Sequence, residues 1–347
     1  MPSLSCAYYE IKSNPEACFY YPVGFFPIPD RPWESIKNAE DFLKSYLEYG
    51  GKSAILRSTK DGTYLSLIEG RNMHTVSTYF LGAFLMEHVL RTRIKARDEY
   101  SQRTFLYSWF IACLSHDFGY LFEESDIYKQ FVGKIETGGI DAFYNEFISS
   151  PPDGRIFKSY TYEQVDYYFR KRAKEFHCID HGIVGGILLY TNLLKALEEW
   201  KCLTKVPGNS SLRYYHDRLF RIPMNPRKYF AEFADSIISH NIFIKKMNQW
   251  RANDQMEDLK HKPFSMKYKR LAFILGLADT LEPIKRFDYN PSCLDHISIE
   301  IKNNDRIVIT CDENINTTNY FLGIKDMEGW LNVKVVACNR SITIILI

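Results

Sequence analysis

Four histidines of this sequence lie in apolar stretches of helical character, where an ionisable side chain is uncommon. His240 continues a stripe of apolar residues at helical spacing, which places it on the buried face of a helix. The other histidines have charged or polar neighbours, which is typical of surface imidazoles. A buried set of imidazoles offers nitrogen donors for a transition metal. The four are His74, His116, His181 and His240.

Two aspartates share this unusual setting. Asp117 follows the apolar run FLYSWFIACLS and His116, and Asp279 ends the run LAFILGLA. An isolated carboxylate in a core costs several kcal/mol unless it is paired or binds a cation. The alternative is that all six polar residues are hydrogen-bonded members of an ordinary core. A metal centre built from facing helices would neutralise all of them together, and we favour that interpretation.

The order of these residues resembles a known pattern. His74, His116-Asp117, His181, His240 and Asp279 reproduce the sequence H…HD…H…H…D of the HD-domain superfamily, the metal-dependent phosphohydrolases. The similarity covers roughly residues 70–290. Four short sequence segments also resemble that superfamily. LSHDFGY is similar to its HD motif and DHGIVGG to its H-x-x-G-A segment. ISHN is similar to its fourth helix and LADTLEP to the segment with its terminal aspartate. The residues lie far apart in the chain, so such a site requires five helices to converge.

The resemblance implies a role for each residue. His74, His116, Asp117 and Asp279 would hold one metal, and Asp117 would bridge to a second metal held by His181 and His240. This donor set suits one or two ions of Mn²⁺, Fe²⁺, Co²⁺, Ni²⁺ or Zn²⁺ and does not choose among them. Such a centre would lower the pKa of a shared water and polarise a phosphoryl oxygen, so Asp117 is also the expected catalytic residue.

Further residues near these motifs are expected to contact substrate. A phosphate group needs cations, and polar side chains beside metal ligands can orient it; ordinary solvent-facing roles are the alternative. These candidates are Asp180, Lys245, Lys285 and Arg286. Glycines at 182, 185 and 186 would let helices approach closely, for the metal centre or for packing alone. A second pair, His216-Asp217, lacks an apolar helix before it and is expected to be structural.

The hydrophobic periodicity indicates a mostly α-helical protein. Apolar stripes predict helices in the stretches from Met73 to Lys285, including a polar helix at 160–176, with long connections after Glu124 and Trp200 that would line or cover a site. From Pro291 the period changes to two, which predicts a small α+β unit of ββαββ type. We therefore expect an irregular segment at 1–65 packed on the core, an HD helical bundle at 66–290 and a β-rich unit at 291–347.

Composition is that of a globular protein. The 347 residues are 46% hydrophobic and 25% charged, with a net charge of +2, so no strong general attraction to nucleic acid is expected. The 8 cysteines form no CxxC pair and read as reduced thiols. No apolar run approaches the ~20 residues of a membrane span, so a cytoplasmic protein without membrane contact is expected. Phosphate-loop, dinucleotide, nucleophile-elbow and HExxH motifs are missing.

The leading expectation is a divalent-metal-dependent phosphohydrolase that acts on a nucleotide or another small phosphate ester. Three alternatives use the same residues: a nuclease, which needs a basic groove; a di-iron oxygenase; and a metal-binding sensory module without turnover. In the HD phosphodiesterases and nucleases a lysine often follows the HD-x-G word, and Tyr120 stands there in this chain. Self-association into a homo-oligomer stays open.

Overall fold

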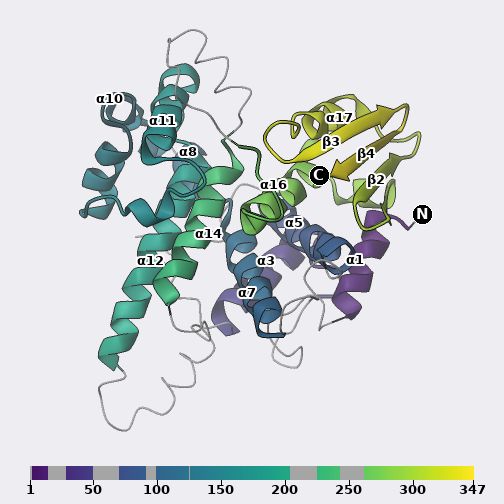
Figure 1. Cartoon of the computed structure of the whole chain (residues 1–347), viewed down its shortest axis with the longest axis horizontal. Helices are drawn as coiled ribbons and strands as arrows, with labels where there is room; N and C mark the ends of the chain where they lie inside the picture. The colour runs from purple at the N-terminus through teal and green to yellow at the C-terminus, as the bar shows by residue number, and fades with distance from the viewer. Residues whose placement is uncertain are drawn as a thin grey trace. The chain divides into compact units, whose positions relative to one another are not determined.

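The computed structural model describes residues 2–14, 29–49, 70–90, 99–124, 126–203, 225–242 and 262–347. Within them the chain is mostly helical and ends in a small four-stranded antiparallel sheet (Figure 1). This confirms the expected class, mostly α with a small C-terminal α+β unit. Lys245 and the pair His216-Asp217 lie outside the described residues.

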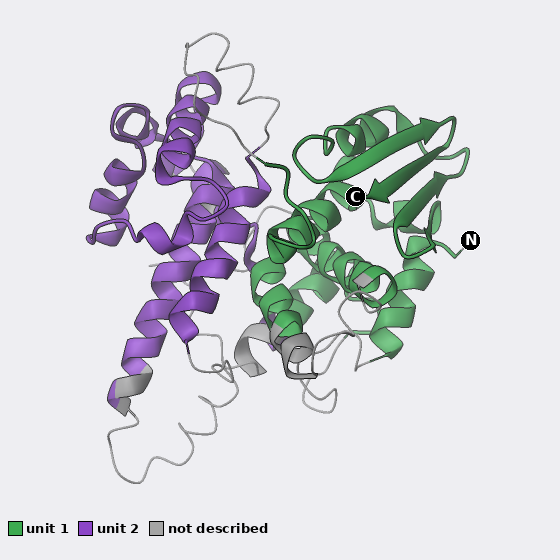
Figure 2. Cartoon of the chain, in the orientation of Figure 1, with its two compact units in different colours: residues 1–43, 68–114, 243–347 green, residues 44–67, 115–242 purple. Residues whose placement is uncertain are grey.

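The chain divides into two compact units (Figure 2). Unit 1 comprises residues 1–43, 68–114 and 243–347, and unit 2 comprises residues 44–67 and 115–242. The chain passes from unit 1 to unit 2 between Leu114 and Ser115, immediately before His116. Each unit is described separately below.

Unit 1 is centred on a helix that is buried on all sides. This helix is α5 (Arg71–Leu85); residues 72–85 are all buried, and it packs against α1 (Leu4–Ser13) and α16 (Arg270–Leu281). Residues 4–13 were expected to be irregular, but Ser3 caps a regular helix there by accepting from the Cys6 amide. The other helical elements are α3 (Ile36–Tyr49, shared with unit 2), η2 (Met86–Leu90), α7 (Glu99–Ser115), η5 (Ile284–Arg286) and η6 (Pro291–Asp295).

The C-terminal part of unit 1 has the expected ββαββ order. Its elements are β1 (Ile297–Lys302), β2 (Arg306–Cys311), α17 (Thr317–Lys325), β3 (Val333–Cys338) and β4 (Ser341–Leu346). The antiparallel strands lie in the order β1-β2-β4-β3. Ile299 pairs with Ile309 and Ile309 with Ile342, and all three are buried, so alternate residues form one apolar face.

Unit 2 is helical in its described part. Its elements are α8 (Tyr120–Glu124), α9 (Asp126–Lys129), α10 (Val132–Phe143), η3 (Tyr144–Ile148), η4 (Gly154–Ile156), α11 (Tyr162–Phe176), α12 (His181–Leu203) and α14 (Pro226–His240). α12 packs along α14, and α10 packs against α11 (Figure 1). A Cβ at Gly186 would stand 2.7 Å from the Ala234 carbonyl oxygen, so glycine is what lets α12 and α14 approach.

The long connection after Glu124, which we expected to line or cover a site, is folded into several helices. It contains α9, α10 and α11. A capping box between Thr161 and Gln164 fixes the start of α11. α11 confirms the polar helix predicted near 160–176. In the described residues, no helix combines the length and the apolar character that crossing a membrane would require.

Candidate metal centre

Four of the six predicted metal ligands meet within unit 2. His116 and Asp117 follow α7 directly, His181 is the first residue of α12, and His240 is the last residue of α14. Their exposed fractions are 0%, 3%, 5% and 2%, respectively. Helix ends converging from three places in the chain thus bring three imidazoles and one carboxylate into the core of this unit.

The distances describe a compact cluster. The His116 Nε2 atom lies 3.2 Å from Asp117 Oδ1, and the His181 Nε2 atom lies 4.0 Å from the same oxygen. The His240 ring centroid is 5.3 Å from that of His116 and 5.4 Å from that of His181. One ligand atom from each of His116, Asp117 and His240 lies within 4.8 Å of the others.

Hydrogen bonds fix which nitrogen of two of these rings can bind a metal. The Nδ1 atom of His240 donates to the Ile237 carbonyl oxygen at 2.5 Å, and that of His181 donates to Glu123 Oε2 at 2.5 Å. With the proton on Nδ1, the neutral ring carries its lone pair on Nε2. The second nitrogen of a metal-binding histidine is usually engaged in this way.

The cluster therefore fits a divalent transition metal in both geometry and chemistry. A metal about 2.1 Å from two ligand atoms at a right angle holds them about 3 Å apart, close to the separation between His116 and Asp117. Imidazole nitrogen with carboxylate oxygen and no thiolate is the donor set of Mn²⁺, Fe²⁺, Co²⁺, Ni²⁺ and Zn²⁺ sites. These buried groups could hold a metal ion, and the donor set leaves its identity open.

Gly119, two residues after Asp117, permits this arrangement. A Cβ at Gly119 would stand 1.9 Å from the His181 carbonyl oxygen, far inside van der Waals contact. Only a residue without a Cβ lets the turn after His116-Asp117 touch the start of α12. The Tyr120 ring then stacks on the His181 imidazole, with centroids 3.7 Å apart.

Unit 1 holds the other two predicted ligands, His74 of α5 and Asp279 of α16. The His74 Nε2 atom lies 3.0 Å from Asp279 Oδ1, while His74 Nδ1 donates to Glu282 Oε2 at 2.6 Å. His74 and Glu282 are 0% exposed and Asp279 is 8% exposed. Glu282 therefore orients His74 as Glu123 orients His181: the carboxylate accepts from Nδ1, and Nε2 faces another carboxylate oxygen.

Glu282 is a functional candidate that the sequence analysis missed. Besides His74, its carboxylate accepts from the Ser77 hydroxyl at 2.6 Å and from the Ile284 amide at 2.9 Å. Burial and the Lys285 ammonium lower the pKa of His74, but Glu282 and the hydrogen bond with Asp279 outweigh them, so the pKa is raised from its ordinary value. The one available signal was an acid directly after the buried end of α16.

The predicted substrate-binding residues have other contacts. Lys285 donates from Nζ to Asp279 Oδ1 at 2.5 Å, and exposed Arg286 lies against Gly323 of α17. Asp180 is 0% exposed and accepts from the Ile183 amide at 3.1 Å, which caps the start of α12. The structure therefore gives Asp180 a structural task, and it places Lys285 on a predicted metal ligand.

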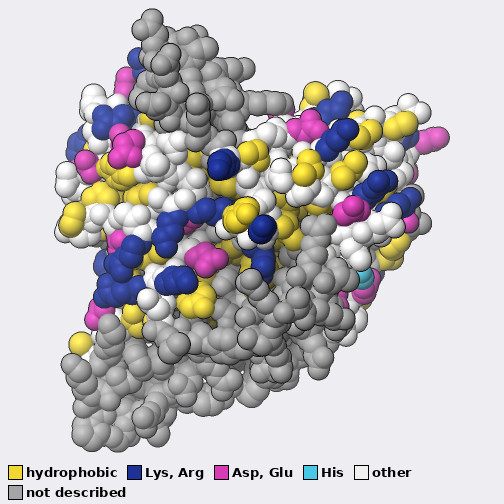
Figure 3. Space-filling view, viewed as in Figure 1, with side chains coloured by type: hydrophobic (Ala, Val, Ile, Leu, Met, Phe, Trp, Pro, Cys, Tyr) yellow, Lys and Arg dark blue, Asp and Glu magenta, His cyan; other side chains and the backbone are white. Residues whose placement is uncertain are grey.

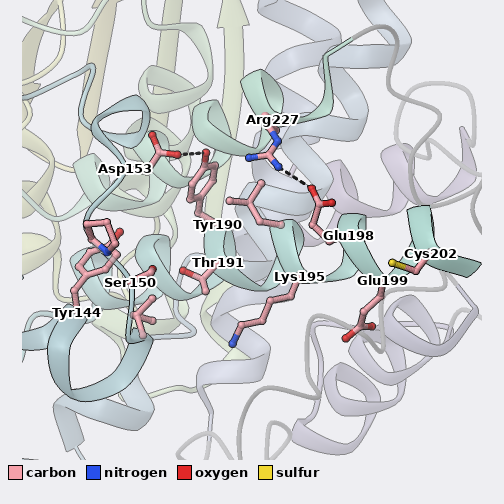
Figure 4. Close-up of a pocket in the computed structure, with 13 residues that line it drawn as sticks. Tyr144, Ser150, Asp153, Tyr190, Thr191, Lys195, Glu198, Glu199, Cys202 and Arg227 are labelled. Atoms are coloured by element: carbon pink, nitrogen blue, oxygen red, sulfur yellow. Dashed lines mark hydrogen bonds and ion pairs between the residues drawn. The ribbon is translucent and has the colours of Figure 1, made fainter.

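Unit 2 also contains a cavity away from the cluster. It has a volume of about 910 Å³ and lies along α12 from Tyr190 to Cys202, beside the residues before η4 and Arg227 of α14 (Figure 4). The Tyr190 hydroxyl donates to Asp153 at 2.7 Å, and Arg227 pairs with Glu198 at 2.7 Å. None of the predicted site residues lines it, but Ser150, Pro151 and Asp153 do, and they lie in the connection after Glu124 that was expected to line or cover a site.

Charges of both signs share the surface of the described residues. On the face shown in Figure 3, lysine and arginine side chains lie among aspartate and glutamate side chains. The net charge of +2 agrees with this mixture.

Comparison of the chain with protein-family models, with curated proteins and with solved structures gave no match.

Proposed function

We propose that this protein is a divalent-metal-dependent phosphohydrolase that acts on a nucleotide or another small phosphate ester. The supporting observation is the buried meeting of His116, Asp117, His181 and His240 in unit 2, with Nδ1 of two rings already engaged. Polar side chains at such depth are costly unless they are hydrogen-bonded, paired or bound to a cation, and one shared cation would serve all four. The order of the residues resembles the HD pattern, and the proposal takes its reaction class from that resemblance.

The predicted metal ligands have different roles in this proposal. The three imidazoles would supply neutral nitrogen donors, and Asp117 would supply a negatively charged carboxylate that, as the resemblance implies, serves both ions if two are bound. A bound divalent metal would polarise a phosphoryl oxygen and lower the pKa of a water, which is the chemistry of phosphate-ester hydrolysis. His74 and Asp279 carry matching donor geometry within unit 1, and the resemblance assigns them to the metal site as well.

Metal analysis and phosphate release test this proposal. The purified protein should contain a transition metal and release phosphate from members of a nucleotide panel with Mn²⁺, and a chelator should abolish the release. Asp117→Ala should reduce the rate by at least about 100-fold, because losing a direct carboxylate ligand should cost at least as much as losing an outer partner of a ligand. Asp126→Ala, on the exposed helix α9 of the same unit, should leave the rate unchanged.

Two results would count against the proposal. Phosphate release that survives Asp117→Ala and chelation would refute the mechanism. Bound iron with an oxygen-dependent reaction, and no phosphate release, would replace hydrolysis with oxygenation at the same residues. His74→Ala and Asp279→Ala, measured in parallel, test whether the unit 1 pair serves the same centre.

A further inference from the structure

Arg172 of α11 lies against two carboxylates from other segments of unit 2. Its Nη2 atom donates to Glu123 Oε1 at 3.1 Å, and its Nε atom lies 3.3 Å from Asp180 Oδ2. The side chains of Arg172 and Glu123 are 12% and 17% exposed, and that of Asp180 is 0% exposed. A guanidinium suits this position because its planar fork can serve two acids at once.

The first carboxylate orients a predicted metal ligand. Glu123 uses Oε1 for Arg172 and Oε2 for His181, from which it accepts both the backbone amide at 3.2 Å and Nδ1 at 2.5 Å. Both carboxylate oxygens of Glu123 are thus engaged as acceptors, one by Arg172 and one by His181. Glu123 therefore remains an acceptor that keeps the His181 proton on Nδ1.

The second carboxylate anchors the neighbour of another ligand. Asp180 accepts from the Asn241 side-chain amide at 2.8 Å through Oδ2, while its Oδ1 caps α12. Asn241 directly follows His240, and its carbonyl oxygen accepts from the Tyr168 hydroxyl of α11 at 2.8 Å. The end of α14 that bears His240 is thus tied to the start of α12 and to α11.

We propose that Arg172 is the positioning residue of the unit 2 metal cluster. It aligns His181 through Glu123 and secures the His240 end of α14 through Asp180. The inference rests on the metal site of the proposed function and deepens it. It also assigns a task to α11, which lies in the long stretch between Asp117 and His181: this helix supplies the support of the site.

Co²⁺ titration of the full chain tests this role, because cobalt reports ligand geometry in its visible spectrum. Arg172→Met should weaken Co²⁺ binding by about 10- to 100-fold, the usual effect of removing a partner of metal ligands, and should alter the spectrum. Arg172→Lys should restore binding only in part, since one ammonium cannot span both acids. The matched control is Arg170→Met, which removes the ion pair with Asp166 on the same helix and should change neither quantity.

A readout without metal keeps the proposal independent of the reaction. In nitrogen-15 spectra of the metal-free protein, the His181 Nδ1 proton should be protected in the wild type and exchange faster in Arg172→Met. If Arg172→Met fails to fold, Glu123→Gln serves instead, because it keeps the size of the side chain while it breaks the charge pair; it should weaken Co²⁺ binding in the same direction.

The outcomes separate the two proposals. A folded Arg172→Met protein with unchanged Co²⁺ affinity, spectrum and Nδ1 exchange would overturn the role of Arg172. A wild-type protein that binds Co²⁺ but releases no phosphate would overturn the hydrolase and leave the role of Arg172 intact. If the wild type bound no Co²⁺, the Nδ1 exchange would still decide whether Arg172 controls His181.

Discussion

His74, His181 and His240 each use Nδ1 as a donor, and each has a different acceptor. His74 donates to Glu282, His181 to Glu123 and His240 to a backbone carbonyl oxygen. A carboxylate acceptor raises the basicity of the opposite nitrogen more than a carbonyl does. His74 and His181 are therefore expected to be the stronger nitrogen donors of the set.

Asp153 supplies a pH-dependent contribution to stability in unit 2. It accepts from Arg155 at 2.9 Å and from the Tyr190 hydroxyl at 2.7 Å. The Arg155 hydrogen bond lowers its pKa to about 2, against a smaller opposing effect of burial and with help from Tyr190. Because the folded pKa lies below the ordinary value of 3.8, this stabilisation is complete above about pH 4 and is lost as the pH falls toward about 2.

Urea unfolding of the wild type and of Asp153→Asn checks this contribution. The free energy of unfolding of the wild type should exceed that of Asp153→Asn above about pH 4, and the difference should shrink as the pH falls toward about 2. A difference that stays constant across this range would show that the carboxylate contributes no pH-dependent stability.

Helix α12 contacts its neighbours at two glycines, where no side chain would fit. Its first residue meets Gly119, and further along Gly186 meets α14. Gly119→Ala should destabilise the protein by at least about 1–3 kcal/mol, the usual cost of overpacking, and should weaken metal binding because His181 must move. Chemical denaturation and Co²⁺ titration measure the two effects.

Gly133→Ala is the matched control for that substitution. A Cβ at Gly133 of α10 meets nothing within 4 Å, so alanine should leave metal binding unchanged. It should also raise the stability by up to about 1 kcal/mol, because alanine favours a helix. Equal effects of the two alanines would contradict the assigned role of Gly119.

The sequence predicted the elements that carry strong periodicity and the polar residues that interrupt it. His240 and Asp279 were recognisable because an apolar stripe or run surrounds them, and the ββαββ order because alternation replaces helical spacing. Glu123 and Arg172 were not recognisable, because they stand among charged residues that resemble a solvent-facing surface, and Glu282 had only its place directly after the buried end of α16 as a signal. Tertiary packing alone buries them, and local patterns carry no record of it. The helix at residues 4–13 was not predicted because the proline-rich stretch that follows it is typical of irregular backbone.

At the scale of the whole molecule, the C-terminal sheet is part of unit 1 and packs on its helices. Trp330 is 1% exposed and lies against Gly276 of α16, where a Cβ would stand 2.6 Å from its ring. The Tyr320 hydroxyl of α17 donates to the Leu281 carbonyl oxygen at 2.7 Å. The C-terminal part of unit 1 therefore shares buried contacts with α16.

Trp330→Ala should lower the free energy of unfolding by about 3–5 kcal/mol, the cost of emptying a large buried site. Val336→Ala, on the exposed edge strand β3, should change it by less than about 0.5 kcal/mol. Equilibrium denaturation, followed by far-UV circular dichroism because the variant lacks a tryptophan, measures both free energies of unfolding. A small effect of Trp330→Ala would show that the sheet is not held by this contact.

The order of the segments has a consequence during synthesis. Nearly all of the described part of unit 2 comes from the continuous stretch 115–242, whereas unit 1 joins residues before that stretch to residues after it. On the ribosome, α8 to α14 can assemble as soon as they emerge, while α5 must wait with an apolar surface uncovered until α16 has been translated. Nascent chains stalled before residue 270 should therefore need chaperones to shield α5.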